Sequence, residues 1–219
     1  MDRDSACFLS LLADFIHGRR PAGECASGVD WERVCRLGHM HAVGGVLFFL
    51  VKQLELEKEP CTPPAHVMKP LRSAFLSTVA RAAAQELEME AVIGALCRAR
   101  IRHLLFKGYD LRDMYPVKEL RTMGDIDLLV DPGRTCEADG LLRELGFTLR
   151  QPAGDVRNYS KGGVHLELHT RLFHKNFSGG VDAVSYFAVC WNFAEPRPNG
   201  YTHTLAVRRH FLYLLVHLA

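Results

Sequence analysis

The chain has 219 residues, 48% of them hydrophobic and 24% charged, which is the composition of an ordinary globular protein that can bury a core. Its 27 basic residues nearly balance 25 acidic ones, so the net charge of +2 gives no support to a nucleic-acid partner. No apolar run approaches the roughly 20 residues that a bilayer-crossing helix needs, so we expect no membrane span.

The cysteines and the N-terminus both point to a reducing compartment. The seven cysteines are scattered, without a CxxC pair or a Cys/His spacing that is typical of a tetrahedral metal site. The N-terminal MDRDSACFLSLLADF has acidic residues on both sides of its apolar stretch, and no small-residue cleavage site follows it. We therefore expect reduced thiols in a cytoplasmic protein.

The first hundred residues have the patterns of helices. Apolar side chains recur at spacings of three and four between Phe8 and Ile16, and again between Val34 and Met40. Asp30 is placed to cap the second of these helices. A linker follows at 57–66, and a long helical pattern runs from about Val67 to Arg100. This part is expected to be a packing region without catalytic residues.

From Ile101 onward, short strands and helices alternate. The order of elements predicts an α+β fold, in which a small mixed sheet is packed against helices and preceded by the N-terminal helical region. The expected elements are a short apolar run IRHLLFK, a brief helix after Gly108, a strand in MGDIDLLVD with its turn at 131–133, a helix from about Arg134 to Leu145 ended by Gly146, a hairpin in VRNYSKGGVHLELH that turns at Gly162-Gly163, and a helix from about Val207.

The chain is therefore expected to divide into three parts: a helical region at 1–100, the α/β core at 101–206, and the start of a C-terminal helical region at 207–219. The last segment, RRHFLYLLVHLA, is strongly apolar and has neither a cap nor a polar tail. Such a helix normally packs on something further along the chain, so we expect a shortened form of a longer protein or an incomplete domain that this helix closes.

Two acidic residues on one strand carry the first chemical signal. Asp125 and Asp127 are separated by one apolar residue, and a strand sends alternate side chains to the same face. Their Cα atoms are then about 7 Å apart, and like charges at such a distance favour a cation as their partner. Mg²⁺ prefers a few carboxylates together with phosphate oxygens, so the pair is a candidate magnesium site.

A second strand and a turn extend this site. In VHLELH, alternation places His165, Glu167 and His169 on one face, so Glu167 completes a cluster of three carboxylates if the two strands are neighbours. Metal ions held by such a cluster neutralise charge on a leaving pyrophosphate and lower the pKa of an attacking hydroxyl. Lys107 and Gly108 add a possible phosphate contact, because glycine allows close backbone approach and lysine supplies charge.

The chain resembles the uncharacterised branch of the nucleotidyltransferase superfamily, whose members are relatives of the polymerase-beta-type minimal transferases. The segments that carry this resemblance are FKGYDLRDMYP, Arg121, MGDIDLLV, the helix ending in LGF, and VHLELH. The resemblance covers about residues 101–173. It implies metal-binding and catalytic roles for Asp125, Asp127 and Glu167, and triphosphate contacts around Lys107 and Gly108. The phosphate turn departs from the family pattern, since Gly108-Tyr109 stands in place of glycine-serine and the gap to Asp125 is longer.

Several of these residues also have structural interpretations. Arg121 either contacts phosphate or pairs with a nearby acid such as Glu119. His169 either contacts phosphate or substrate or is a satisfied structural histidine. Lys107 binds phosphate or is a solvated strand end.

We predict a Mg²⁺-dependent nucleotidyltransferase that uses a nucleoside triphosphate such as ATP and an acceptor that the sequence does not identify. The alternatives are a catalytically silent nucleotide- or protein-binding module of the same fold, and an RNA-modifying toxin of a toxin–antitoxin pair.

Overall fold

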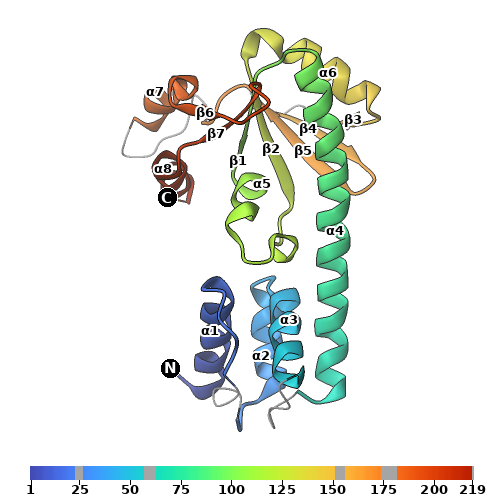
Figure 1. Cartoon of the computed structure of the whole chain (residues 1–219), viewed down its shortest axis with the longest axis vertical. Helices are drawn as coiled ribbons and strands as arrows, with labels where there is room; N and C mark the ends of the chain where they lie inside the picture. Colours follow the sequence, from blue (N-terminus) through green and yellow to red (C-terminus); the bar gives the residue numbers. More distant parts are fainter. Residues whose placement is uncertain (23–26, 57–62, 151–155, 174–181, 219) are drawn as a thin grey trace. The chain divides into compact units, whose positions relative to one another are not determined.

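A computed structural model describes residues 1–22, 27–56, 63–150, 156–173 and 182–218 (Figure 1). These residues form two compact units. Unit 1 comprises Met1–Ala83 and Arg112–Thr122, and unit 2 comprises Ala84–Leu111 and Met123–Ala219. The predicted linker at 57–66 lies mostly outside the described residues. The division of the chain at residues 100 and 206 stays a prediction.

Unit 1 is helical, as the apolar spacing predicts. The Asp30 carboxylate accepts hydrogen bonds from the backbone N–H groups of Glu32 and Arg33, which confirms its role as an N-cap. Buried side chains such as Leu11 and Leu50 form a core that these helices share. The helices are α1 (Arg3–Ile16), α2 (Trp31–Met40), α3 (Gly44–Leu56) and the first part of α4 (Ala65–Arg98), with the 3₁₀ turns η2 (Arg112–Met114) and η3 (Lys118–Leu120).

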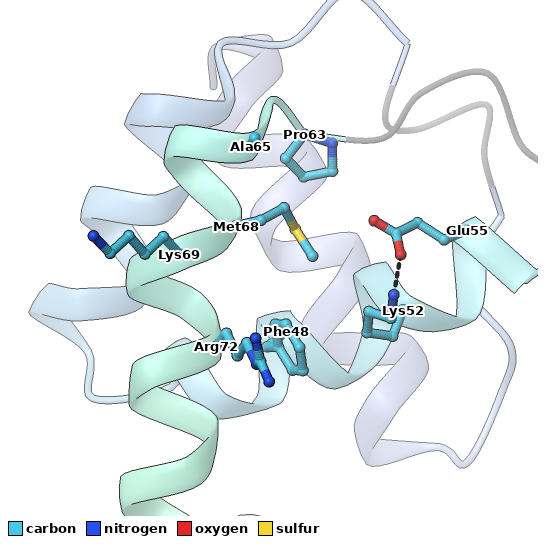
Figure 2. A pocket seen from close by; sticks show the side chains of 8 residues that line it. All are labelled: Phe48, Lys52, Glu55, Pro63, Ala65, Met68, Lys69 and Arg72. Atoms are coloured by element: carbon cyan, nitrogen blue, oxygen red, sulfur yellow. Dashed lines mark hydrogen bonds and ion pairs between the residues drawn. The ribbon is translucent and has the colours of Figure 1, made fainter.

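An open pocket of about 720 Å³ lies in unit 1 between α3 and the start of α4 (Figure 2). Its lining combines apolar side chains with basic ones, and Figure 2 shows Lys52 paired with Glu55 at one side. The lining residues are Phe48, Lys52, Glu55, Pro63, Ala65, Met68, Lys69 and Arg72. None of the residues predicted to be catalytic lines this pocket.

Unit 2 contains a mixed sheet, so the α+β fold class is confirmed. Within the described part of the chain the sheet has seven strands, in the order β3-β4-β5-β2-β1-β7-β6. The β2–β5 and β1–β7 pairs are parallel, and the other neighbours are antiparallel. The strands are β1 (His103–Phe106), β2 (Asp125–Val130), β3 (Thr148–Leu149), β4 (Val156–Lys161), β5 (Val164–His169), β6 (Ala194–Pro196) and β7 (Thr202–Leu205).

The two faces of this sheet have separate cores, because side chains alternate along each strand. Ile126 and Leu128 lie in a core shared with the end of α4 and with α6, whereas Leu104 and Leu129 lie in one shared with α7 and α8. Figure 1 shows these two pairs of helices on opposite sides of the sheet. The helices and turns of unit 2 are α5 (Gly108–Leu111), η4 (Pro132–Arg134), α6 (Thr135–Glu144), α7 (Ala183–Ala188), η5 (Cys190–Asn192) and α8 (Val207–Leu218).

Local signals predicted most of these elements, but they missed α7, β6 and β7. The strand at 125–130, the helix that ends before Gly146 and the hairpin are confirmed. Gly146, Gly162 and Gly163 have φ values of +88°, +54° and +84°, which explains why glycine occupies these turns. By contrast, β6 and β7 are only 3 and 4 residues long, and β7 joins the sheet beside β1, which is distant in sequence.

Helix α8 confirms the predicted helix near Val207. It buries His210 and Tyr213 against unit 2. Its outer side exposes five large apolar residues: Val207, Phe211, Leu212, Leu215 and Leu218. No helix in the described ranges is both long enough and apolar enough to span a membrane.

We expect Gly163→Ala to destabilise the hairpin by about 1–2 kcal/mol, because a side chain at its φ of +84° is strained. Gly140→Ala in α6 is the matched control. An added Cβ there meets no atom within 4 Å, so we expect stabilisation of about 0.5–1 kcal/mol. Urea unfolding of the two variants measures both changes. Equal effects of the same sign would contradict the assigned turn geometry.

Candidate active site

Two neighbouring strands bring the central carboxylates together. In the parallel β2–β5 pair, Asp127 lies directly opposite Glu167. Asp127 is buried, with 5% of its surface exposed, and Glu167 is partly buried. His169 lies two residues after Glu167, so its side chain is on the same face of the sheet. The sheet register thus juxtaposes two acids predicted from separate sequence motifs.

A hydrogen-bonded cluster of four side chains results. The Lys107 Nζ donates to Asp127 Oδ1 at 2.8 Å, and the His169 Nε2 lies 3.0 Å from the same oxygen. The His169 Nε2 is also 3.2 Å from Glu167 Oε2. Lys107 reaches this point from the end of β1, where Phe106 is paired with Asp127. One carboxylate oxygen therefore meets an ammonium and an imidazole at once.

The cluster shifts the pKa values of its members. Burial alone would raise the pKa of Asp127, but hydrogen bonds from His169 and Lys107 outweigh burial and lower it. The hydrogen bond with His169 lowers the pKa of Glu167. For His169, burial would lower the pKa, but hydrogen bonds to Asp127 and Glu167 raise it above the ordinary value. Both carboxyl groups are thus held ionised, and the imidazole is biased toward its cationic form.

Aromatic side chains form the surroundings of the cluster. The ring of Phe106 meets His169 edge to face, with centroids 5.1 Å apart, and Tyr213 of α8 packs on Phe106 at 5.6 Å. Burial raises the pKa of the Tyr213 hydroxyl, and the negative charges of Asp127 and Glu167 raise it further. The carboxylates therefore lie beside an apolar wall, where electrostatic interactions are stronger than in water.

The donor atoms of this cluster fit a divalent cation. Asp127, Glu167 and His169 each offer one ligand atom, and these atoms lie within 4.8 Å of one another. The site already accommodates one positive charge, the Lys107 ammonium, at the most buried carboxylate. Two carboxylates are ligands that Mg²⁺ accepts when phosphate oxygens and water complete its shell. In its neutral form, His169 is a potential ligand in addition to the acids.

Asp125 lies apart from the hydrogen-bonded cluster. It begins β2 opposite His165 and is exposed, and it is not among the three residues whose ligand atoms converge. Its position two residues before Asp127 places it on the same face of the strand. The predicted metal role of Asp125 stays a prediction, in which its exposed side chain turns toward the cation.

The other two predicted phosphate contacts have different surroundings. Gly108 directly follows Lys107 and begins the short helix α5. Arg121 belongs to unit 1, where its guanidinium lies 5.6 Å from the centroid of the Tyr115 ring and donates to the carbonyl of Thr122. The predicted phosphate roles of Gly108 and Arg121 remain predictions.

A second group of polar residues, behind Lys107, was not predicted from the sequence. The buried His210 of α8 accepts a hydrogen bond from the backbone N–H of Lys107, and it is also paired with Asp110. The available signal in the sequence was a histidine within the apolar segment RRHFLYLLVHLA, whose pattern predicts a packing helix. Its partner could not be found from spacing, because Lys107 is 103 residues away.

The raised pKa of His169 gives a pH dependence to stability. A raised folded-state pKa stabilises the protein fully below the unfolded value of about 6.5, and this stabilisation is lost as the pH rises through the folded value. We therefore expect His169→Gln to destabilise the fold more at about pH 6 than at about pH 9, as measured by urea unfolding. His66→Gln, at an exposed position, is the control. A cost that grows with pH would contradict the hydrogen-bonded cluster.

The chain is similar to a known protein family and to a solved structure. The sequence model of a family described as uncharacterised nucleotidyltransferase matches residues 27–219. The solution structure of the antibiotic-resistance factor ANT(2'')-Ia is similar at 18% identity and a TM-score of 0.36, over 41% of this chain and 48% of that one. The chain thus spans about half the length of that protein. No curated protein matches the sequence.

Proposed function

The chain belongs to the uncharacterised nucleotidyltransferase family, and on this premise we propose that it transfers a nucleoside monophosphate from a nucleoside triphosphate to an acceptor hydroxyl with the help of Mg²⁺. Family membership supports nucleotidyl transfer. The observation that carries the metal-dependent reaction is the pairing of Asp127 and Glu167 on neighbouring strands, with Lys107 and His169 bound to them.

Three carboxylates of this chain are the proposed metal ligands. Asp127 and Glu167 already converge, and the exposed Asp125 joins them from the same face of β2. Magnesium held there would supply positive charge to the phosphates and lower the pKa of the acceptor hydroxyl. The convergence of the Asp127 and Glu167 oxygens on one face of these central strands supports this assignment, because like charges this close together favour a cation.

The proposed transfer is a displacement at the α-phosphorus. The acceptor oxygen forms a bond to this phosphorus, the bond to the bridging oxygen of the β-phosphate breaks, and pyrophosphate leaves. Glu167 accepts the hydroxyl proton and passes it to solvent. Its side chain is 28% exposed, against 7% for Asp127, so it is the acid of the cluster that both substrate and water can reach.

The cationic side chains are proposed to bind the triphosphate. The Lys107 ammonium is bound to Asp127, and we propose that it exchanges this carboxylate for a phosphate oxygen when the triphosphate binds. His169 is biased toward its charged form by its hydrogen bonds, which suits a contact to phosphate. Gly108 and Arg121 are proposed as further phosphate contacts, on the basis of the sequence pattern.

We also propose that the protein is located in the cytoplasm. The free thiols of the five described cysteines support this location.

Isothermal titration with each of the four ribonucleoside triphosphates, with and without Mg²⁺, tests this function. We expect Mg²⁺-dependent binding by the wild type and at least about tenfold weaker binding by Glu167→Gln. Glu137→Gln, an exposed position in α6, is the matched control and is expected to bind like the wild type. Failure of the wild type to bind any of them would overturn the proposal. Binding without transfer to any acceptor would favour the silent binding module.

A further inference from the structure

The backbone of Lys107 has a conformation that must be held in place. Its φ is +53°, in the left-handed region that residues other than glycine rarely adopt. Such a conformation costs about 1–2 kcal/mol, and it persists where neighbouring structure holds it. This backbone turn directs the lysine from the end of β1 to Asp127, where its Nζ lies 2.8 Å from the carboxylate. A contact that stabilises this backbone conformation therefore also positions the ammonium group of Lys107.

The buried side chain of His210 stabilises this backbone conformation. The backbone N–H of Lys107 donates to Nε2 of His210 at 3.0 Å. A nitrogen that accepts a hydrogen bond carries no proton, so the proton of the neutral imidazole is on Nδ1. This Nδ1 lies 3.3 Å from Oδ2 of Asp110 and points its N–H to that carboxylate. The imidazole thus links the carboxylate of α5 to the backbone of the preceding turn.

Asp110 is itself fixed by other groups. Arg197 donates to its Oδ1 at 2.7 Å, and the hydroxyl of Thr204 in β7 donates to its Oδ2 at 2.5 Å. Burial alone would raise the pKa of Asp110, but hydrogen bonds from His210 and Thr204 and the charge of Arg197 lower it. Asp110 is therefore an ionised acceptor that selects the tautomer of His210, as carboxylates do behind other functional imidazoles.

We propose that Asp110 and His210 are positioning residues that set the Lys107 backbone, so that its ammonium is presented to the triphosphate. This inference rests on the proposed function. Neither residue belongs to the cluster of Asp127, Glu167 and His169, so the pair acts through Lys107. The arrangement also gives α8 a part in the site, because this helix contributes the imidazole.

Two substitutions of His210 separate positioning from packing. His210→Phe keeps a ring in the buried position but removes the acceptor, whereas His210→Gln keeps an acceptor oxygen. We expect His210→Phe to shift the Lys107 amide proton upfield in ¹H–¹⁵N NMR and to weaken Mg²⁺-dependent binding of ribonucleoside triphosphates about tenfold. We expect His210→Gln to restore most of both. Binding of Mn²⁺ alone is expected to be unchanged in each variant, since the carboxylates are untouched.

The inference is overturned if the Lys107 amide does not move in His210→Phe, if nucleotide affinity stays unchanged while it moves, or if Gln behaves like Phe. Should His210→Phe not fold, Asp110→Asn replaces it. The single Nδ1-protonated tautomer, read from imidazole ¹⁵N shifts, is then expected to become mixed, and an unchanged tautomer overturns the inference. If the wild type binds no triphosphate, the proposed function fails, whereas the Lys107 amide still decides whether His210 sets this backbone.

Discussion

Asp127→Asn is expected to lower nucleotidyl transfer by about 10³-fold or more, the largest effect of any single change in this chain. Asp127 is the most enclosed acid of the site, and its Oδ1 is the atom on which Lys107 and His169 converge. An amide has the same shape but carries no charge, so it is a far weaker ligand for a divalent cation. Pyrophosphate release and Mg²⁺-dependent nucleotide binding should be lost together.

The same substitution should also cost stability. Lys107 and His169 would be left as neighbouring cations without their shared counter-charge, and we expect a loss of about 2 kcal/mol in the free energy of unfolding. Glu144→Gln is the matched control, because Glu144 is exposed at the end of α6 and lies outside the hydrogen-bonded cluster. It should leave both transfer and stability close to the wild type. Transfer within a few-fold of the wild type in Asp127→Asn would remove the carboxylate site from the mechanism.

Asp125→Asn is expected to lower transfer by about 10²-fold while leaving stability unchanged. Asp125 shares a strand face with Asp127 but is exposed and outside the hydrogen-bonded cluster. We therefore expect its charge to contribute to binding the cation rather than to folding. The two Asp→Asn variants thus separate the two roles of carboxylates in this site.

Activity assays and thermal unfolding of the two variants, made side by side, check this contrast. An Asp125→Asn variant with full activity would restrict the carboxylate ligands of the metal to Asp127 and Glu167, whose oxygens converge in the structure. An Asp125→Asn variant that loses stability as Asp127→Asn does would show that its side chain has folded-state partners.

The site residues that were predicted from the sequence are those whose role shows in the pattern of neighbouring residues. The alternation in DIDLLV and VHLELH assigns Asp127 and Glu167 to one side of their strands, and the double glycine specifies the hairpin. These local rules do not state that β2 and β5 are neighbours. The motif resemblance implied that Glu167 joins the two aspartates, and in the structure β2 pairs with β5 so that Asp127 lies opposite Glu167.

The parts that were missed depend on contacts between distant segments. Strand β7 is four residues long and pairs with β1 across about a hundred residues, so no window of sequence contains both partners. Similarly, His210 reads as part of an apolar helix, and its function appears only when α8 packs beside the turn at Lys107. The separation of Asp125 from the convergent ligands also lies beyond pattern analysis, because strand periodicity fixes a face but not a side-chain conformation.

Paramagnetic NMR with Mn²⁺ in place of Mg²⁺ tests the central claim, that the carboxylates of β2 and β5 bind a divalent cation together with a nucleotide. With a ribonucleoside triphosphate present, Mn²⁺ should broaden the imidazole signals of His169 far more than those of the exposed His66. Asp127→Asn should abolish this selective broadening. Equal broadening of the two histidines, or broadening that persists in Asp127→Asn, would contradict a metal site on this face of the sheet.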